Sequence, residues 1–346
     1  MRIFILSLVV IFLSFNALSH ECRVEFPYKQ NWLGADAAYS VKLGDDKTLW
    51  LFGDTFLGQK NRSFDKFLSN SIAISNCRGQ IDYFYGDNHS DFFIHPEYNK
   101  GYKYWPKAGF IYKNTLYINL LEVKIDASGA LGFKETATVM AQIENYNINP
   151  TKWKITYQPM TRNEYLFPGT EIIVEKNEVY SFATLVQEKI SVLDDAKLIR
   201  PIVALKLNLE NYTFKYLDKK NRWRAFKRKE QIKDAKILFE SANTEMSVHY
   251  SHTNKEWIAI YSHASLAKNS IVKRTSKSLL GFWSEEMKIY DYPETSKDIF
   301  CYAGKAHSKL SSDQSLLITY VCNAFTVDEI LSNFNIYRPQ VFYLDI

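Results

Sequence analysis

The sequence lacks the short motifs that identify many catalytic classes. It has no Cys-x-x-Cys pair, which argues against a zinc ribbon or a dithiol redox site. It also has no Gly-x-Ser-x-Gly elbow, no glycine-rich phosphate loop and no His-Glu-x-x-His pair. Long amphipathic helical patterns are scarce. The functional residues must therefore be sought in features that recur along the chain.

Only one long apolar run occurs, and it lies at the start of the chain. Arg2 precedes the run Ile3 to Phe15, and the small residues Ala17-Leu18-Ser19 follow it. This is the pattern of a secretory signal, and the run is too short for a transmembrane helix. We expect residues 1–19 to be removed, and residues 20–346 to form one secreted or periplasmic domain that does not insert into a membrane.

The charge is mild, at +5 over 346 residues. The single dense basic run comprises Lys219-Lys220, Arg222, Arg224 and Lys227-Arg228-Lys229. Such a run is more often a solvated loop than a nucleic-acid or membrane patch. We expect no nucleic-acid partner.

Four cysteines in a secreted chain suggest two disulfides, for which three connectivities exist. We favour Cys22–Cys77 and Cys301–Cys322. The second pair flanks a predicted hairpin, and the first would tie the N-terminus to the first sheet.

Apolar runs are short, rich in β-branched and aromatic residues, and broken by polar turns, which is typical of many short strands. One unit recurs: an apolar strand, a polar turn and a second apolar strand. The turns fall near Asp45, Asn114, Asn177, Asn254 and Asp313. The outgoing strands are Leu49 to Phe52, Thr115 to Leu121, Val179 to Ala183, Trp257 to Ser262 and Ser315 to Val321. Five such hairpins predict an all-β fold, a five-bladed β-propeller.

Other elements are predicted from weaker patterns. We expect strands at Ile202 to Leu207, Ile271 to Arg274, Gly281 to Ser284 and Arg338 to Asp345, and a short helix within Thr326 to Phe334. Propellers often close by joining both termini in one blade, so Cys22 to Phe26 is expected to pair with the last strand.

Two aspartates occupy matched ends of the first hairpin. If Gly44-Asp45-Asp46 is the loop, Leu43 pairs with Lys47 and Asp36 stands opposite Asp54. Like charges placed opposite each other destabilise a sheet, so a fold keeps such a pair when chemistry uses it. Paired carboxylates are the working groups of most glycosidases. In other interpretations Asp54 caps a turn, or the pair holds a calcium or sodium ion; otherwise we expect no cofactor.

The incoming strand of each unit begins with a polar residue. In order, these residues are Asp36, Lys107, Glu171, Glu245 and Lys305. In a propeller the innermost strands surround a central channel, so the five would converge on one mouth. Glu245 or Glu171 could then protonate a leaving oxygen. The alternative is that all five are strand-end charges facing water.

Several further residues are candidates for substrate binding. Trp105 could offer an apolar face to a sugar ring, although tryptophan is more often a core residue. Polar contacts to substrate are expected from Lys107, Lys305, His307, Tyr39 and Asn323, with Trp32 as another rim candidate.

Two segments resemble the first blade of a known group of propellers. They are Gly34 to Ser40 and Leu49 to Phe56, and they look like the opening of secreted bacterial five-bladed propellers of formerly unknown function, some of which are endo-D-arabinanases. More broadly the chain resembles the arabinanase and levansucrase class of glycoside hydrolases. Weaker similarities are Tyr104-Trp105-Pro106, Ser278 to Ser284, Lys305 to Ser308 and Leu317 to Asn323.

The resemblance implies an active site at one end of the channel, with Asp36 as a catalytic carboxylate and Asp54 as its partner. The chain departs from that group at Ala37, where a glycine is usual, and at Gly281-Phe282-Trp283, where a Gly-Pro-Trp-like turn is usual. We therefore expect a monomeric glycoside hydrolase acting on a polysaccharide, with arabinan-type furanose polymers as the first candidate. The alternative is a non-catalytic propeller that binds a glycan or a protein.

Overall fold

The computed structural model describes residues 22–59, 64–127, 132–186, 200–226, 229–240, 242–265, 268–294, 296, 298–312 and 315–345. The predicted signal sequence and the predicted turn residue Asp313 lie outside the described residues. In the part of the chain that is described, no helix is long and apolar enough to cross a membrane.

Strands dominate the described residues, which confirms the all-β prediction. The strands are β1 (Trp32–Ala35), β2 (Tyr39–Gly44), β3 (Lys47–Phe52), β4 (Thr55–Gly58), β5 (Phe64–Leu68), β6 (Ser71–Ser75), β7 (Ile81–Phe84), β8 (Tyr102–Tyr112), β9 (Thr115–Ile125), β10 (Phe133–Ile143), β11 (Ile155–Arg162), β12 (Leu166–Glu175), β13 (Glu178–Leu185), β14 (Ile202–Asn208), β15 (Thr213–Leu217), β16 (Trp223–Ala225), β17 (Ile237–Phe239), β18 (Met246–Ser251), β19 (Glu256–Ser262), β20 (Ser270–Ser276), β21 (Met287–Asp291), β22 (Ile299–Ala306), β23 (Ser315–Ala324) and β24 (Gln340–Asp345). The helices are short: α1 (Val327–Ser332) and the 3-10 turns η1 (Tyr98–Lys100), η2 (Pro150–Lys152), η3 (Lys229–Asp234) and η5 (Ser308–Leu310).

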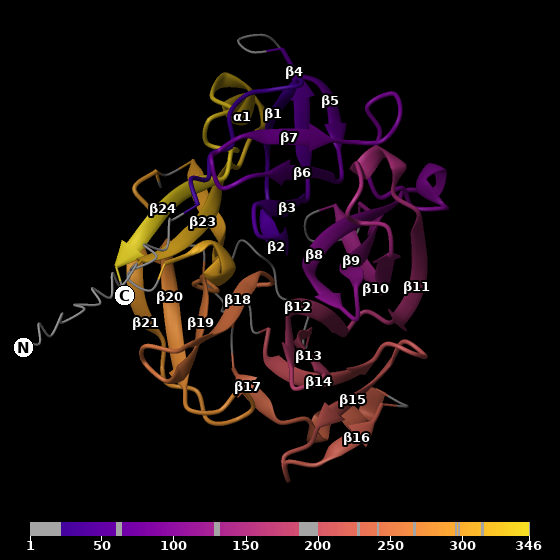
Figure 1. Ribbon diagram of the computed structural model, residues 1–346, viewed down its shortest axis with the longest axis vertical. Coiled ribbons are helices and arrows are strands. Elements are labelled where there is room, and N and C mark those ends of the chain that lie inside the picture. The colour runs from indigo at the N-terminus through magenta and orange to yellow at the C-terminus, as the bar shows by residue number, and fades with distance from the viewer. Residues whose placement is uncertain are drawn as a thin grey trace, which may run out of the picture.

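All five predicted hairpins form, as the antiparallel pairs β2–β3, β8–β9, β12–β13, β18–β19 and β22–β23. Each begins a sheet: β2-β3-β6-β7, β8-β9-β10-β11, β12-β13-β14-β15-β16, β18-β19-β20-β21 and β22-β23-β24. The first strand of each sheet packs against the first strand of the next, from β2 to β22. Figure 1 shows these sheets one after another around a common centre, with β2, β8, β12 and β18 closest to it.

Two sheets depart from this plan. The residues on either side of the first hairpin form a separate small sheet, in the order β1-β4-β5. The sheet that begins with β12 has six strands, because β15 and β16 extend it and β17 pairs with β14. The predicted strand at 202–207 is its central strand β14.

Three local predictions are corrected by the structure. Gly281 to Ser284 is not a strand, because Gly281 closes a turn onto Ser278 (N–O 3.0 Å) and β21 begins only at Met287. The last strand begins at Gln340 rather than Arg338. Trp32 is buried in the core, stacked on Tyr83 at 4.3 Å, and is not a rim residue.

The termini meet differently from the prediction. The segment 22–26 pairs with Arg78 through Arg23, not with β24. Instead β1 lies against the C-terminal segment, where Arg338 Nε donates to the carbonyl of Leu33 at 3.1 Å. Gly34 permits this approach, since a Cβ there would lie 2.3 Å from the carbonyl oxygen of Tyr337.

Both predicted disulfides are present. Cys22 is bonded to Cys77 and Cys301 to Cys322, and the second pair joins residues directly opposite each other on β22 and β23. The first bond ties the N-terminal segment to the β2-β3-β6-β7 sheet, next to Ser75 at the end of β6.

In three of the innermost strands, β8, β12 and β22, the regular pairing is interrupted next to one of the polar residues predicted at the channel. Regular pairing is interrupted between Pro106 and Gly109 of β8, between Phe167 and Glu171 of β12, and between Tyr302 and Lys305 of β22. Bulges of this kind twist a strand and redirect a side chain. Lys107, Glu171 and Lys305 lie within or directly after these interruptions.

Left-handed backbone occurs within two of these interruptions, at Gly169 and Ala303, and also at Ala37 just before β2. Ala37, Gly169 and Ala303 have φ angles of 67°, 90° and 58°. For a residue with a Cβ, this conformation costs roughly 1–2 kcal/mol. Ala37 occupies the position where the resembling group has glycine, so the chain keeps the conformation without the residue that adopts it most easily.

Replacing Gly169 with alanine should destabilise the fold by about 2–4 kcal/mol, because a clash adds to the backbone strain. A Cβ there would lie 2.4 Å from Cγ of the buried Asn119. Gly132 is a matched control, since its φ is also positive (77°) but no atom lies within 4 Å of an added Cβ. Urea unfolding should therefore give a loss of only about 1 kcal/mol for Gly132→Ala. Equal losses for the two variants would contradict the clash.

Candidate active site

Asp36 and Asp54 stand opposite each other, as the sequence predicted, but the pairing of Leu43 with Lys47 on which that prediction relied is wrong. Gly44 pairs with Lys47, and the register shifts between Lys42 and Gly44. The pairing Val41↔Leu49 in β2–β3 and Ala35↔Thr55 in β1–β4 keeps one register on both sides of the pair. The Asp36 N–H donates to the Asp54 carbonyl at 3.2 Å. The Asp36 carbonyl in turn accepts from the Gly53 N–H at 3.3 Å. The two carboxyl groups are close enough that the charge of Asp36 raises the pKa of Asp54.

The Asp36 carboxyl is enclosed by protein but still reached by solvent. Its Oδ1 passes over Gly53, where a Cβ would lie only 2.4 Å away, and its Oδ2 accepts a hydrogen bond from the Tyr302 hydroxyl at 2.8 Å. Burial and the nearby charge of Glu245 raise the pKa of Asp36 to about 7, against the lowering effects of Tyr302 and Lys305. Asp36 can therefore change protonation state near neutral pH.

Asp54 has different partners. Its Oδ1 accepts a hydrogen bond from the Trp105 indole N–H at 2.8 Å, which brings the second sheet to the site. Burial and the charge of Asp36 raise the pKa of Asp54 well above its usual value, and the Trp105 bond only partly opposes this. The two carboxyls thus share one site but are held by different donors.

The Lys305 ammonium connects three segments of the chain near the centre of the fold. Its side chain is 2% exposed, and its ammonium donates to Glu245 Oε2 at 2.9 Å, to the Ala303 carbonyl at 2.6 Å and to the Ala37 carbonyl. The ammonium also lies 4.7 Å from the centre of the Tyr39 ring. An ammonium has three N–H donors, and all three have acceptors here.

Glu171 is held by the backbone on both of its oxygens. Oε1 accepts from its neighbour Ile172 N–H at 2.8 Å, and Oε2 accepts from Val248 N–H of β18 at 3.3 Å. Burial raises the pKa of Glu171 to about 8, although these two bonds and the charge of Lys305 lower it. Its bond to Val248 links the third sheet to the fourth.

Lys107 is buried, and the described residues offer its ammonium few polar partners. Its ammonium makes one long hydrogen bond, 3.4 Å to Thr170 Oγ1, and the side chain is 5% exposed. Burial lowers the pKa of Lys107 to about 8, opposed by the charges of Glu135 and Glu245. The five in-phase positions of the inner strands are thus brought together, through direct bonds or through their charges.

The remaining substrate-binding candidates are placed less favourably for contact with a ligand. His307 is buried, and its ring nitrogens lie 2.7 Å from Ser40 Oγ and 2.8 Å from Thr319 Oγ1. Tyr39 is buried and donates to the Thr170 carbonyl at 3.2 Å. Asn323 bonds the N–H of Ala324, and among the described residues no hydrogen bond joins it to the acids.

Sequence reasoning missed the two tyrosines beside Asp36. Tyr302 donates to its carboxyl, and Tyr337 also lowers its pKa. Tyr302 lies three residues before Lys305, on the other side of a bulge that the sequence did not reveal. Tyr337 comes from the C-terminal segment, and nothing in its sequence surroundings distinguishes it from the other tyrosines.

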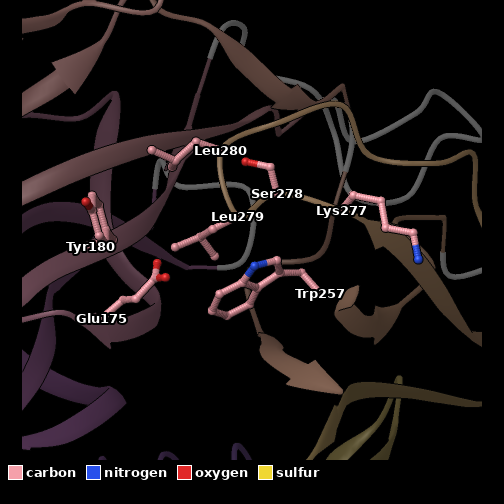
Figure 2. A pocket seen from close by; sticks show the side chains of 7 residues that line it. All are labelled: Glu175, Tyr180, Trp257, Lys277, Ser278, Leu279 and Leu280. Atoms are coloured by element: carbon pink, nitrogen blue, oxygen red, sulfur yellow. The ribbon is translucent and has the colours of Figure 1, made fainter. Parts of the chain in front are cut away.

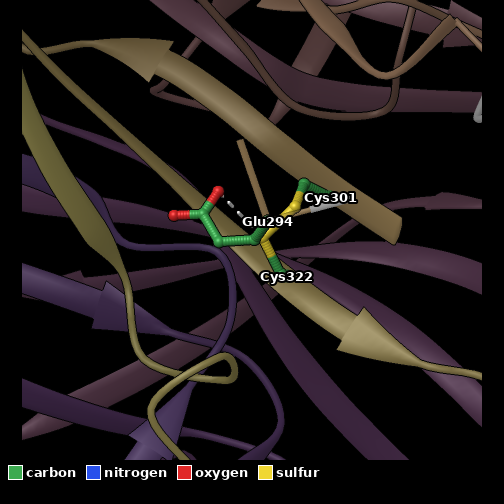
Figure 3. A group of neighbouring side chains, drawn as sticks. All are labelled: Glu294, Cys301 and Cys322. Atoms are coloured by element: carbon green, nitrogen blue, oxygen red, sulfur yellow. Dashed lines mark hydrogen bonds between the residues drawn. A yellow bond between two sulfur atoms is a disulfide. The ribbon is translucent and has the colours of Figure 1, made fainter. Parts of the chain in front are cut away.

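The described residues offer one cluster with the geometry of metal ligands, and it does not include these acids. It consists of Glu294, Cys301 and Cys322 (Figure 3). Both sulfurs are joined in the disulfide and so are not thiolates, while Glu294 accepts from the Tyr320 hydroxyl at 2.9 Å. These three residues do not fit a metal site.

Lys305→Met should cost about 3–5 kcal/mol of unfolding free energy, because it leaves the charge of Glu245 and two carbonyls without their donor. Lys107→Met is the matched control, since it removes an equally buried ammonium that has one long bond. We expect that variant to remain within about 1 kcal/mol of the parent in urea unfolding at pH 7. Similar losses for both lysines would show that burial, not bonding, sets the cost.

The fold is shared with solved structures of low sequence identity. A Bacteroides ovatus protein provisionally termed a hydrolase matches with a TM-score of 0.71 and 18% identity, over 90% of this chain and 86% of its own. An exo-1,5-alpha-L-arabinanase from a bovine ruminal metagenomic library matches with a TM-score of 0.50 and 10% identity, over 92% and 95%. A levansucrase from B. megaterium matches with a TM-score of 0.51 and 12% identity, over 90% and 81%.

These likenesses establish the fold alone, which is that of β-propeller glycoside hydrolases. The fold is the one that the broader resemblance implied, whereas the link to the endo-D-arabinanase group stays a prediction. The comparison with curated proteins gave no significant match. The sequence profile of one family, described as a domain of unknown function, DUF5005, matches residues 25–344, and the chain therefore belongs to that family.

Proposed function

We propose that the protein is a secreted glycoside hydrolase, built as a five-bladed propeller, that cleaves a polysaccharide with the Asp36 and Asp54 carboxyls. One observation carries this proposal: two opposed acids with raised pKa values interact with each other and are held by different donors. Such a pair divides into an ionised and a protonated member, which glycoside hydrolysis requires.

Asp36 is assigned the role of nucleophile. The Tyr302 hydroxyl and the positive charge of Lys305 favour its ionised form. Asp54 has only the Trp105 donor to favour ionisation, while the charge of Asp36 opposes it. Asp54 therefore keeps the proton of the pair and is assigned the role of general acid, which protonates the leaving oxygen.

The two glutamates are assigned supporting roles. Glu245 is bonded to Lys305 and contributes negative charge beside Asp36, which raises the pKa of Asp36. Glu171 accepts two backbone N–H bonds, so its oxygens are already engaged in joining two sheets. Either was a candidate acid from the sequence, but these contacts favour Asp54.

The cross-strand arrangement favours retention of configuration. Retaining enzymes place their two carboxyl groups ≈ 5–5.5 Å apart, whereas inverting enzymes leave ≈ 6.5–9.5 Å for a water molecule. The Cβ atoms of directly opposed residues lie roughly 4.5–5.5 Å apart, which is compatible with the shorter carboxyl separation. Asp36 would then form a glycosyl ester as Asp54 donates its proton, and Asp54 would next act as the base for water.

The substrate is assigned by analogy of fold and by the side chains at the mouth. An arabinanase is among the proteins that share the fold, and an arabinan-type furanose polymer is our first candidate. Trp105 is partly exposed while its indole N–H holds Asp54, so its ring can lie beside a bound sugar. Lys107 is assigned a substrate oxygen as ligand, because its ammonium makes a single long hydrogen bond among the described residues.

Incubation with a panel of D- and L-arabinans, xylans and fructans should release reducing ends from at least one polymer. Asp36→Asn and Asp54→Asn should each lower the rate by about 10²–10⁴-fold, because each removes one proton-transfer or nucleophilic group. Glu171→Gln is the control, with a smaller effect since its role is to join sheets. An intact panel, with glycan affinity that survives in Asp36→Asn, would instead indicate a non-catalytic binding propeller.

The pH profile of kcat/KM should rise as the pH increases through about 7 and fall at higher pH. Asp36 must be ionised, and its pKa is raised to about 7, so protonation inactivates the enzyme below that pH. Asp54 must be protonated, and its pKa is raised as well, so activity is lost when it ionises.

Tyr302→Phe should move the acidic limb of this profile to higher pH, because it removes a donor that lowers the pKa of Asp36. The variant keeps the ring and its packing. An acidic limb near the ordinary aspartate value of about 4, unmoved in Tyr302→Phe, would contradict the assignment of Asp36.

A further inference from the structure

The basic run that the sequence analysis set aside as a loop forms part of an ordered extension. The strand β16 and the turn η3 follow β15, and they extend the third sheet beyond the four strands found in its neighbours. Figure 1 places β15 and β16 at the outer edge of the molecule, away from the central strands. Lys227 and Arg228 lie outside the described residues.

A hollow of about 620 Å³ opens on this extension, and most of its charged lining is positive. It is lined by Tyr216, Asp218, Lys219, Lys220, Arg222, Arg224, Ala225 and Asp234. Four cationic side chains therefore face two acidic ones. All four cationic residues are exposed, so their charge is available to a ligand.

A buried carboxylate organises the arginines. Asp218 is 4% exposed, and its Oδ2 accepts from Arg222 Nε at 3.0 Å and from Arg224 Nε at 3.1 Å. Its Oδ1 accepts from the backbone N–H groups of Lys220 and Arg222, both at 2.9 Å. Although burial raises it, these bonds lower the pKa of Asp218 to about 2, so the carboxylate is ionised at all ordinary pH values.

The result is two guanidinium groups held side by side against their mutual repulsion. Arg222 uses both Nε and Nη2 on Asp218, each at 3.0 Å, and Arg224 uses its Nε. Both side chains remain half-exposed, at 53% for Arg222 and 50% for Arg224. Guanidinium groups fixed in this way are suited to planar, paired recognition of carboxylate or sulfate groups. Fixing them in advance also reduces the entropy lost on binding.

An exposed aromatic ring adjoins the basic hollow. Phe282 is 94% exposed, and the Lys236 ammonium lies 5.4 Å from its ring centre. The same ammonium donates to Asn221 Oδ1 of the basic turn and to the Leu280 carbonyl, both at 2.8 Å. Lys236 therefore fixes the loop that carries Phe282 against the basic extension.

That loop also lines a second hollow, of about 260 Å³, between the third and fourth sheets (Figure 2). Leu279 and Leu280 lie between Tyr180 on one side and Trp257 on the other, with Glu175 beside them. Aromatic rings next to polar groups offer both stacking and hydrogen bonding to sugar rings. The loop thus contributes to the aromatic hollow and carries Phe282, and Lys236 joins it to the basic turn.

We propose that the basic extension and the adjoining loop form a second binding surface, separate from the Asp36 and Asp54 site, for an acidic polysaccharide. The cations would bind carboxylate or sulfate groups, and Phe282 would contact the sugar rings between them. The exposed ring favours a sugar polymer over an anion without sugars. This inference does not require the polymer to be cleaved.

Affinity electrophoresis tests the proposal with polygalacturonate, a polymer of sugar carboxylates, and with dextran as its neutral counterpart. The Asp36→Asn variant serves as the parent, so that cleavage cannot remove the polymer. We expect polygalacturonate to bind and dextran not to bind, and the affinity to fall with added salt. Absence of a preference for the acidic polymer would overturn the proposal.

Two surface variants locate the binding. Lys219→Gln with Lys220→Gln should weaken polygalacturonate binding about tenfold, because two exposed charges of the hollow are removed. Lys100→Gln with Lys152→Gln removes two exposed lysines from the second sheet and should leave the affinity within about twofold. An equal loss in both pairs would mean that only net charge matters, and the site would be wrong.

A substitution of Phe282 tests whether the ligand is a sugar polymer or another anion. Phe282→Ala should weaken binding to polygalacturonate but not to polyphosphate, which has no ring to stack. Vesicles containing phosphatidylserine provide the membrane comparison. Equal or tighter binding to polyphosphate or vesicles, with no effect of Phe282→Ala on polygalacturonate, would overturn the assignment of a polysaccharide. The inference would also be overturned if the protein cleaves glycans but does not bind polygalacturonate.

Discussion

The arrangement of the acids depends on one buried ammonium, that of Lys305. A cation removed from water is costly unless acceptors surround it, and here Glu245 and two carbonyls supply them. Those acceptors belong to segments far apart in the chain, before β2, before β18 and within β22. The solvation of one charge thereby fixes three of the innermost segments relative to one another.

The same ammonium restrains backbone that would otherwise be unfavourable. Both carbonyls that it binds belong to alanines in the left-handed region, Ala37 and Ala303. Such conformations persist where the surrounding structure determines them, and they gather at functional sites. Ala37 directly follows Asp36, so the bond that holds Ala37 also limits where the Asp36 carboxyl can lie.

Much of the site could be predicted because it follows from local rules. The register of the first hairpin was fixed by a tight turn and alternating burial, and it put Asp36 opposite Asp54. The hairpin pattern also brought Lys107, Glu171 and Lys305 to the centre. The bulge before Lys305 could not be predicted, since its left-handed residue is Ala303, which carries no glycine signal.

What sequence reasoning missed depends on contacts between distant segments. His307 appeared to be a ligand to substrate from its spacing to Lys305, but it is enclosed between Ser40 and Thr319. Tyr337 reaches Asp36 only because β1 and the C-terminal segment lie together, which Gly34 allows. Neither contact leaves a periodic pattern in the sequence. The strand predicted at 281–284 is also wrong, because this segment is a loop in which Phe282 is exposed while Trp283 packs against Phe182 and Phe239.

Charged side chains are constrained in two different ways in this chain. At the centre, charges are buried and nearly every one is bonded, so a single substitution disturbs several neighbours. At the outer edge of the third sheet, Asp218 is the one buried charge of the extension's described residues, and the cations around it remain open to solvent. Because one carboxylate organises the extension, its exposed cationic residues can be substituted without disturbing the central strands. The outer surface can therefore adapt to different polymers while the central acids keep their geometry, because no bond among the described residues joins Asp218 to the Lys305 network.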